Sequence, residues 1–92
     1  MTKSQSVIHG RVYDPKGEPV VEARVYFMEG PVSLPDLAVL TDGNGEFSLS
    51  APTAGTYQIG CAAYGFVSTT VTVHITSGQD AQIEIRMREG YR

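Results

Sequence analysis

The stretch 41–66 constrains the fold more than any other part of the chain, because turn signals alternate there with short strand patterns. Residues 42–45 read Asp-Gly-Asn-Gly, a composition that tolerates left-handed backbone conformations and tight reversal. Phe47 and Leu49 then alternate with polar residues, which is the period-two pattern of a half-buried strand. A second turn and a second alternating segment follow. The stretch therefore predicts a pair of short strands bounded by tight turns.

The same alternation recurs along the chain and predicts seven strands with turn signals between them. They cover residues 6–13, 20–28, 38–41, 46–50, 57–61, 67–76 and 81–87. Val, Ile and Thr supply 23 residues and Leu only 4, a bias towards the β-branched side chains that favour strands. We therefore expect an all-β protein, a seven-stranded antiparallel sandwich.

The alternation also predicts which side chains face the core. In the second strand, Val21, Ala23, Val25 and Phe27 share one face and polar residues share the other. Further along, the single cysteine, Cys61, falls on the inward face of its strand, where it is expected to behave as a small core residue.

Length and charge limit the classes of function. Ninety-two residues suit one domain, expected over residues 6–88, with a disordered tail at 1–5 and a short tail at 89–92. The net charge of −3 and the absence of a basic stripe argue against binding to nucleic acid, and also against a membrane surface.

One cysteine excludes an intramolecular disulfide, and no apolar run follows Lys3 as it would in a signal peptide. The chain as given is expected to be cytoplasmic, with a secreted or exported context expected only for a domain excised from a longer precursor.

Six short motifs resemble those of the carboxypeptidase regulatory-like domain, a seven-stranded transthyretin-like (prealbumin-like) β-sandwich. They lie at residues 8–12, 14–20, 23–25, 41–47, 54–57 and 63–66. The resemblance covers about residues 6 to 88. It implies an accessory module that packs beside a catalytic or secreted partner domain and performs no chemistry itself. Related folds occur as extensions of secretion-system spike proteins, as carbohydrate-binding modules and as stalk repeats.

Catalytic residues are not predicted. The zinc site of a carboxypeptidase needs clustered His and Glu ligands, whereas His9 and His74 lie far apart in sequence and neither begins a His-x-x-Glu motif. The chain also resembles hydroxyisourate hydrolase, a transthyretin-fold enzyme, in its Val-Tyr-Asp turn at 12–14 and its final Tyr-Arg at 91–92. However, Arg11 stands where that family has a histidine, and the Gly-Ser that should follow is absent. That activity is kept only as a third alternative.

Metals and cofactors are not predicted either. Asp42, Asn44 and Glu46 have the spacing of the first ligands of a calcium loop. Phe47 and Thr53 occupy the positions where such a loop needs Gly and an acidic residue. A hairpin turn accounts for the same residues.

The segment 29–37 is the least regular part of the chain, and it carries the main prediction of a binding site. Its apolar residues Pro31, Val32, Leu34 and Leu37 either fold down as a lid over the sandwich or present a patch to a protein partner. A free sheet edge offers a further route to a partner or to a homo-oligomer.

The alternative function is carbohydrate binding. Sugar sites rely on exposed aromatic side chains, and this chain has no Trp. Tyr13 and Tyr26 are the candidates for a small aromatic patch.

Overall fold

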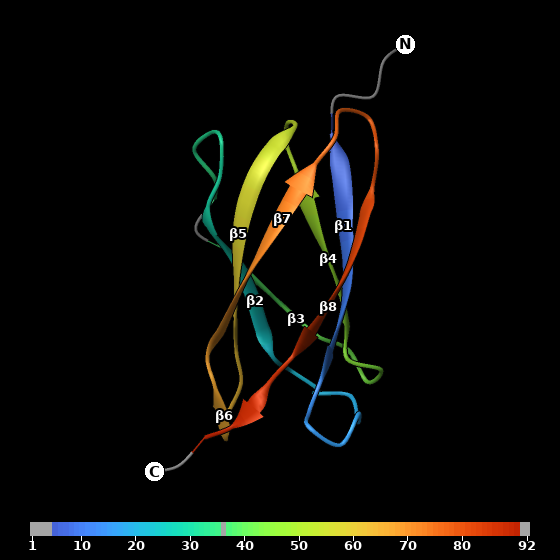
Figure 1. The fold of residues 1–92 in the computed structure, drawn as a ribbon, viewed down its shortest axis with the longest axis vertical. Coiled ribbons are helices and arrows are strands. Elements are labelled where there is room, and N and C mark those ends of the chain that lie inside the picture. The colour runs from blue at the N-terminus through green and yellow to red at the C-terminus, as the bar shows by residue number, and fades with distance from the viewer. Residues whose placement is uncertain (1–4, 36, 91–92) are drawn as a thin grey trace.

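In the computed structural model, residues 5–35 and 37–90 are described and form nine strands (Figure 1). The strands are β1 (Ser6–Tyr13), β2 (Arg24–Glu29), β3 (Ala38–Leu40), β4 (Glu46–Ala51), β5 (Gly55–Ala62), β6 (Phe66–Val67), β7 (Thr69–Ile75), β8 (Ala81–Arg86) and β9 (Arg88–Glu89). The seven predicted strands correspond to all of these except β6 and β9, which have two residues each and pair with one another. No helix in the described part of the chain is long and apolar enough to cross a membrane.

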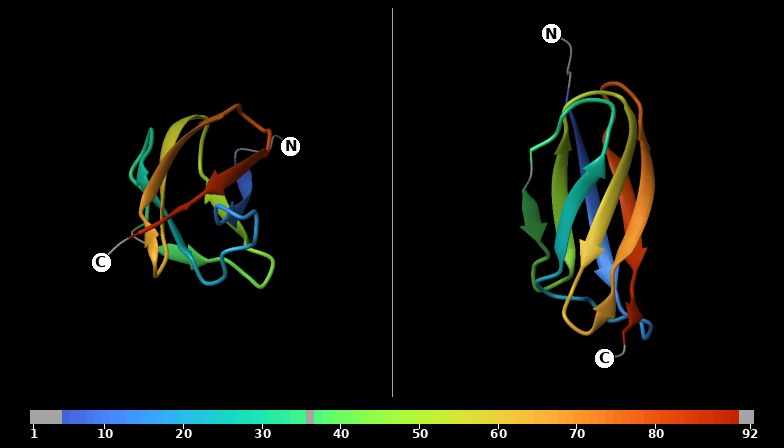
Figure 2. Two further views of the ribbon diagram at one scale, coloured as in Figure 1. Left: turned by 60° about the horizontal axis from the view of Figure 1, so that its bottom comes forward. Right: turned by 90° about the vertical axis from the view of Figure 1, so that its left-hand side faces the viewer.

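Two sheets face each other across the core (Figure 2). One has three strands in the order β4-β1-β8, and the other has four in the order β3-β2-β5-β7. The predicted β-sandwich is therefore confirmed. One ladder departs from the antiparallel expectation, because β1 and β8 run parallel, from Ile8↔Ala81 to Tyr13↔Arg86.

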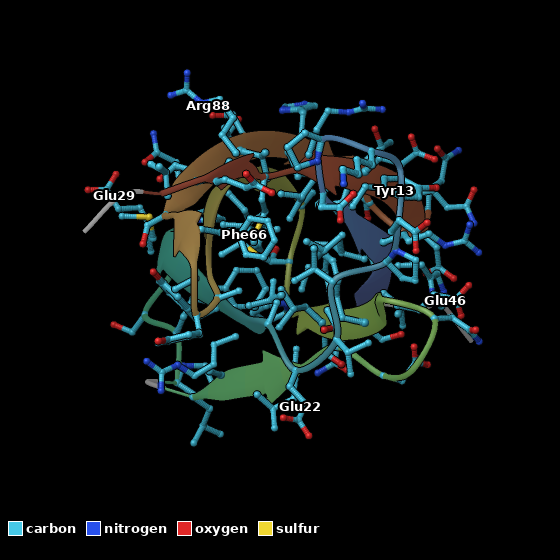
Figure 3. All side chains as sticks on the ribbon, turned by 90° about the horizontal axis from the view of Figure 1, so that it is seen from below. Tyr13, Glu22, Glu29, Glu46, Phe66 and Arg88 are labelled. Carbon is cyan, nitrogen blue, oxygen red and sulfur yellow. The ribbon has the colours of Figure 1, made fainter. Side chains whose placement is uncertain are left out.

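The core lies between the sheets, and its side chains come from the alternating positions of each strand. The pattern of β4 is typical: Phe47, Leu49 and Ala51 are buried, and the intervening residues are exposed. Tyr57, Ile59 and Cys61 of β5 are fully buried. Phe66 packs against this core at the lower end of the molecule, which is seen from below in Figure 3. The predicted inward faces of these strands are confirmed.

The second strand begins later than predicted. Val20 is buried, but Val21 is 51% exposed and occupies a turn with Glu22, so the strand starts only at Arg24. Glu22 has a φ of 61°, a left-handed conformation that a strand cannot contain. The two valines at 20–21 have the sequence pattern of a strand, but they lie beside a tight turn. Val21 therefore does not share the inward face of Ala23.

Two turns at the same end of the molecule have the same construction. Oδ1 of Asp42 accepts hydrogen bonds from the backbone N–H groups of Asn44 and Glu46, both at 2.9 Å. Asp14 accepts from Lys16 and Glu18 in the same way, at 2.8 and 2.9 Å. In each turn the fourth residue is a glycine with positive φ. The backbone donors lower the pKa of the Asp42 carboxyl group.

The ends of the domain differ slightly from the predicted boundaries. Residues 1–4 and 91–92, which belong to the two predicted tails, lie outside the described residues. At the C-terminal side, Glu89 pairs with Phe66, and the N–H of Gly90 donates to the carbonyl of Gly65 at 2.9 Å. The predicted boundary after Arg88 therefore falls inside β9.

Cys61 is expected to be inert in the folded protein. Burial raises the pKa of its thiol to about 11, and its Sγ lies 3.8 Å from Sδ of Met87. At pH 8 the thiol should react with a disulfide reagent at least tenfold more slowly in the native chain than in guanidinium chloride. In the native chain the reagent cannot reach the buried sulfur, and little of the thiol is ionised. Rapid labelling of the native chain would contradict this expectation.

The same pKa shift affects stability at high pH. The pKa is raised in the folded state, so the unfolded thiol, with an ordinary pKa near 9.0, ionises first. The contribution of this group to stability is therefore fully present below pH 9 and falls as the pH rises towards 11.

Candidate functional site

The irregular segment before β3 divides into an anchored part and an exposed part. Pro31 lies over Gly55, where an added Cβ would come within 2.7 Å of the proline Cγ. Leu34 is half-buried, packs against the core, and lies close to Gly30. Leu34 therefore packs inward, and a docking role for it would require it to leave the core, whereas Pro31 contacts Gly55 but is itself exposed.

The two other residues predicted in this segment are exposed, as Pro31 is. Val32 is 46% exposed and Leu37 is 72% exposed. Leu37 adjoins β3, an edge strand that pairs only with β2. Leu40, at the end of β3, is also 58% exposed, whereas Val39 between them packs against the core. We call Leu37, Ala38 and Leu40 the β3 edge surface.

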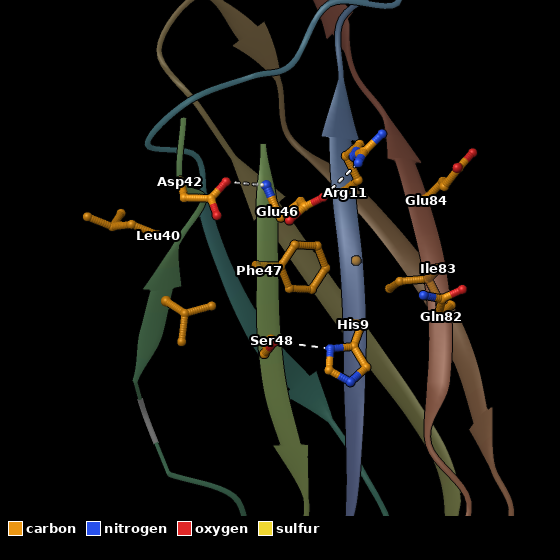
Figure 4. Close-up of a pocket in the computed structure, with 12 residues that line it drawn as sticks. His9, Arg11, Leu40, Asp42, Glu46, Phe47, Ser48, Gln82, Ile83 and Glu84 are labelled. Carbon is orange, nitrogen blue, oxygen red and sulfur yellow. Dashed lines mark hydrogen bonds and ion pairs between the residues drawn. The ribbon is translucent and has the colours of Figure 1, made fainter. Parts of the chain in front are cut away.

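A second surface covers the outer face of the three-stranded sheet (Figure 4). Two rows of polar side chains cross the strands in register and flank a shallow depression. One row is Glu46, Arg11 and Glu84, and the other is Ser48, His9 and Gln82. Between them run Phe47, Gly10 and Ile83, whose side-chain positions face inward. We call this surface the polar face.

The charges of the polar face are largely paired with one another. Nη2 of Arg11 donates to Oε2 of Glu46 at 2.6 Å, and this hydrogen bond raises the pKa of the guanidinium further above its ordinary value. The hydroxyl of Tyr13 accepts from Arg11 and donates to Glu84, both at 3.3 Å. Because these side chains are accessible to solvent and form hydrogen bonds with one another, we interpret the polar face as a solvated surface.

The acidic turn beside the polar face uses its carboxylate for the fold. Oδ1 of Asp42 accepts two backbone hydrogen bonds, as described above. The described residues contain no group of three or more His, Cys, Asp or Glu side chains arranged to hold a metal ion. The arrangement supports the hairpin interpretation of residues 42–46.

The two histidines lie in different sheets. His9 is on the outer face of β1, where Nδ1 lies 3.3 Å from the hydroxyl of Ser48. His74 is on the outer face of β7, 3.0 Å from the hydroxyl of Thr56. The core separates these faces, so the pair cannot act on one substrate within one chain.

The two candidate tyrosines are also separated. Tyr13 belongs to β1 in the three-stranded sheet, and Tyr26 belongs to β2 in the four-stranded sheet. Tyr26 lies over its cross-strand partner Gly60, where an added Cβ would come within 2.5 Å of the ring. The predicted aromatic patch for carbohydrate therefore does not form from these two residues.

Neither Leu40 nor Tyr64 was predicted from the sequence to be exposed, and both are. Leu40 is the outward residue of a strand whose middle residue faces in, so alternation alone could have identified it. Tyr64, which lies in the motif at 63–66, is 97% exposed in the turn before Phe66. No local sequence signal distinguishes a tyrosine that packs from one that points into solvent.

Solved structures with the same fold come from different kinds of protein. The major pilin subunit BcpA of Bacillus cereus has a TM-score of 0.77 at 15% identity, covering 94% of this chain and 29% of the pilin. The 3-chlorocatechol 1,2-dioxygenase of Rhodococcus opacus has a TM-score of 0.72 at 13% identity, and the match covers 97% of this chain and 62% of the dioxygenase. The TIE protein of Bacillus anthracis has a TM-score of 0.70 at 17% identity, and the match covers 95% of this chain and 17% of the TIE protein. This chain therefore spans less than two thirds of each.

These likenesses establish the fold alone, since the pilin and the dioxygenase share it at similar identity. A comparison with curated protein sequences finds no significant match. The model of the carboxypeptidase regulatory-like domain matches residues 7–88, which is nearly the whole chain and includes β1 to β8. The chain therefore belongs to the carboxypeptidase regulatory-like domain family.

Proposed function

We propose that this domain is a non-catalytic accessory module that binds a protein partner along the β3 edge surface. The observation that carries the proposal is the exposure of Leu37 and Leu40, at 72% and 58%: Leu37 directly precedes the edge strand β3, and Leu40 is its last residue. Exposed leucines beside unpaired backbone groups suit an extended segment of another chain, which adds a strand and covers the apolar side chains.

The remainder of the molecule supports an accessory role. His9 and His74 stand on opposite sheets, and the charges of the polar face are paired with each other. Each histidine contacts one exposed hydroxyl, Ser48 for His9 and Thr56 for His74, and the core separates the two pairs, so they cannot combine into one catalytic set. The family membership agrees with this role, as does the occurrence of the same fold within a pilin subunit.

The partner is expected to contact the edge rather than the anchored lid. Leu34 packs against the core, so changing it would damage the fold and confuse the test. Leu37 and Leu40 can be changed with little effect on stability because most of each side chain already faces solvent.

The test begins with photo-crosslinking from a benzoylphenylalanine placed at position 40 in cells that express the full-length protein. The protein identified in this way is then purified and its affinity measured by calorimetry. Leu37→Asp with Leu40→Asp should weaken binding at least tenfold, because two desolvated carboxylates would face an apolar segment. Val67→Asp, at a 43% exposed valine in β6, is the matched control and should bind normally. Equal affinity of the edge variant and the wild type would refute the proposed surface.

A further inference from the structure

One half of the sandwich carries hardly any charge. From Phe47 to Gln79 the sequence contains no Asp, Glu, Lys or Arg. This stretch includes both β5 and β7, which are neighbours in the four-stranded sheet. The outer face of that pair presents Thr56 and Gln58 from β5, and Thr70, Thr72 and His74 from β7. A surface of this kind lacks the charges that keep exposed sheets apart.

The strand β7 is an edge of its sheet, as the right-hand view of Figure 2 shows. Soluble proteins protect such edges with charged residues, prolines, bulges or very short strands. Within its own seven residues β7 has none of these protections, because it contains no Pro and no formal charge and pairs with β5 without a register shift. Just before it, Val67 of β6 pairs with Arg88 of β9, so the free edge is limited to β7 itself.

The other three edges are shorter, carry charged residues or end at a proline. β3 has only three residues and follows closely after Pro35. β4 begins at Glu46 and is followed directly by Pro52. β8 carries Glu84 and Arg86 on its outer face. The difference singles out β7 as the long edge without charge, whereas β3 offers an edge of only three residues.

Side chains of the inner face are also incompletely covered along β7. Val73 and Ile75 are buried, whereas Thr69 and Val71, which point to the same side, are only half-buried. Val71 packs against the core and is still partly open to solvent. A strand added beside β7 would cover this half of the edge.

From these observations we propose that β7 is a self-association edge, at which two copies of the chain pair their β7 strands antiparallel about a two-fold axis at Thr72. The occupant is a second copy because the strand is complementary to itself. The axis at its central residue pairs all seven positions, and Thr72 meets its own counterpart.

The register that this axis sets is chemically compatible on both faces. On the outer face, Thr70 lies opposite His74 of the second copy, a combination that repeats the existing Thr56–His74 hydrogen bond of 3.0 Å. On the inner face, Val71 lies opposite Val73 of the second copy. β7 carries no formal charge, so the paired strands themselves contain no like-charge pair.

The register is tested by cysteine crosslinking under mild oxidation. Two Cα atoms directly opposite in an antiparallel pair are about 4.5–5.5 Å apart, which a disulfide can bridge. Thr72→Cys should therefore give a covalent dimer. Thr70→Cys is the matched control. In this register Thr70 of one copy and Thr70 of the other are offset by four residues, or about 13 Å along the strands, which is beyond the reach of a disulfide. Cys61 is buried and does not interfere. Equal crosslinking of the two variants, or crosslinking of the control alone, would overturn this register.

The association itself is tested by sedimentation equilibrium across a range of concentrations. The wild type should approach twice the 9.9 kDa of one chain. Thr72→Lys places two ammonium groups face to face at the axis and should raise the dissociation constant at least tenfold. Ser50→Lys makes the same charge change on the outer face of β4 and should leave the dimer intact. A wild type that stays monomeric at several hundred micromolar, or a Thr72→Lys dimer of unchanged affinity, would refute the proposal.

This edge lies at the opposite margin of the sheet from β3. The outcome is therefore independent of whether a partner protein binds at Leu37 and Leu40.

Discussion

Replacing Gly10 with alanine is expected to destabilise the fold by about 1–3 kcal/mol, because the added methyl group has no room beneath the ring of Phe47. Gly10 and Phe47 are cross-strand partners in β1 and β4. An added Cβ at Gly10 would lie 2.1 Å from Cζ and 2.3 Å from Cε1 of that ring. Phe47 is only 6% exposed, so the ring cannot move aside without displacing other core residues. Urea unfolding followed by circular dichroism measures the loss.

Two other glycines provide graded controls for this experiment. Gly43→Ala should be nearly neutral, because no atom lies within 4 Å of the position that its Cβ would occupy. Gly60→Ala should fall between the two: its Cβ would meet Tyr26 at 2.5 Å, but Tyr26 is half-buried on the outer face and can move towards solvent. Combining Gly10→Ala with Phe47→Leu should cost less than the sum of the two single changes. If Gly10→Ala were as stable as Gly43→Ala, the packing account of this pair would be wrong.

The strands and the core could be predicted because each is encoded locally. A strand with one face against the core alternates between buried and exposed residues, and β4 and β7 do so clearly. The tight turns follow the same logic. Asp14 and Asp42 each precede a glycine by three residues, and each carboxylate binds two backbone N–H groups of its own turn. Such features need no knowledge of distant parts of the chain.

Pairings between distant segments could not be predicted from local pattern. The parallel ladder of β1 with β8 joins the two ends of the domain, and nothing in residues 6–13 specifies a partner more than seventy positions away. The late start of β2 has a similar cause. Val20 and Val21 resemble the beginning of a strand, but the turn at Glu22 is held by residues far along the chain.

The candidate site was only partly predictable for a different reason. An apolar residue in an irregular segment satisfies the sequence pattern equally well as a lid or as a patch. The structure divides the segment: Leu34 packs inward, whereas Leu37 points into solvent. The charge-free edge β7 was visible in the sequence, but its importance depends on the sheet order, which leaves β7 without a second neighbour.

Thr41 is the residue from which we expect the second large effect, because it holds the turn at Glu22 in place. It is 3% exposed, and its hydroxyl accepts from the N–H of Ala23 at 2.8 Å and donates to the carbonyl of Val20 at 2.7 Å. Thr41→Val preserves the shape of the side chain but leaves a backbone donor and a backbone acceptor buried without a partner. Each unsatisfied group costs about 1–3 kcal/mol, so we expect the two together to cost about 2–6 kcal/mol.

Thr41→Ser distinguishes the contribution of the hydroxyl group to stability from that of the methyl group. Serine keeps both hydrogen bonds and loses one buried methyl, so its cost should be about 1 kcal/mol and well below that of valine. The turn offers a further check, since Glu22 has a φ of 61° and Glu22→Gly should relieve strain there. Chemical denaturation should therefore rank the stabilities as Glu22→Gly, then wild type, then Thr41→Ser, then Thr41→Val. Equal stability of the serine and valine variants would show that packing, and not the pair of hydrogen bonds, holds the turn.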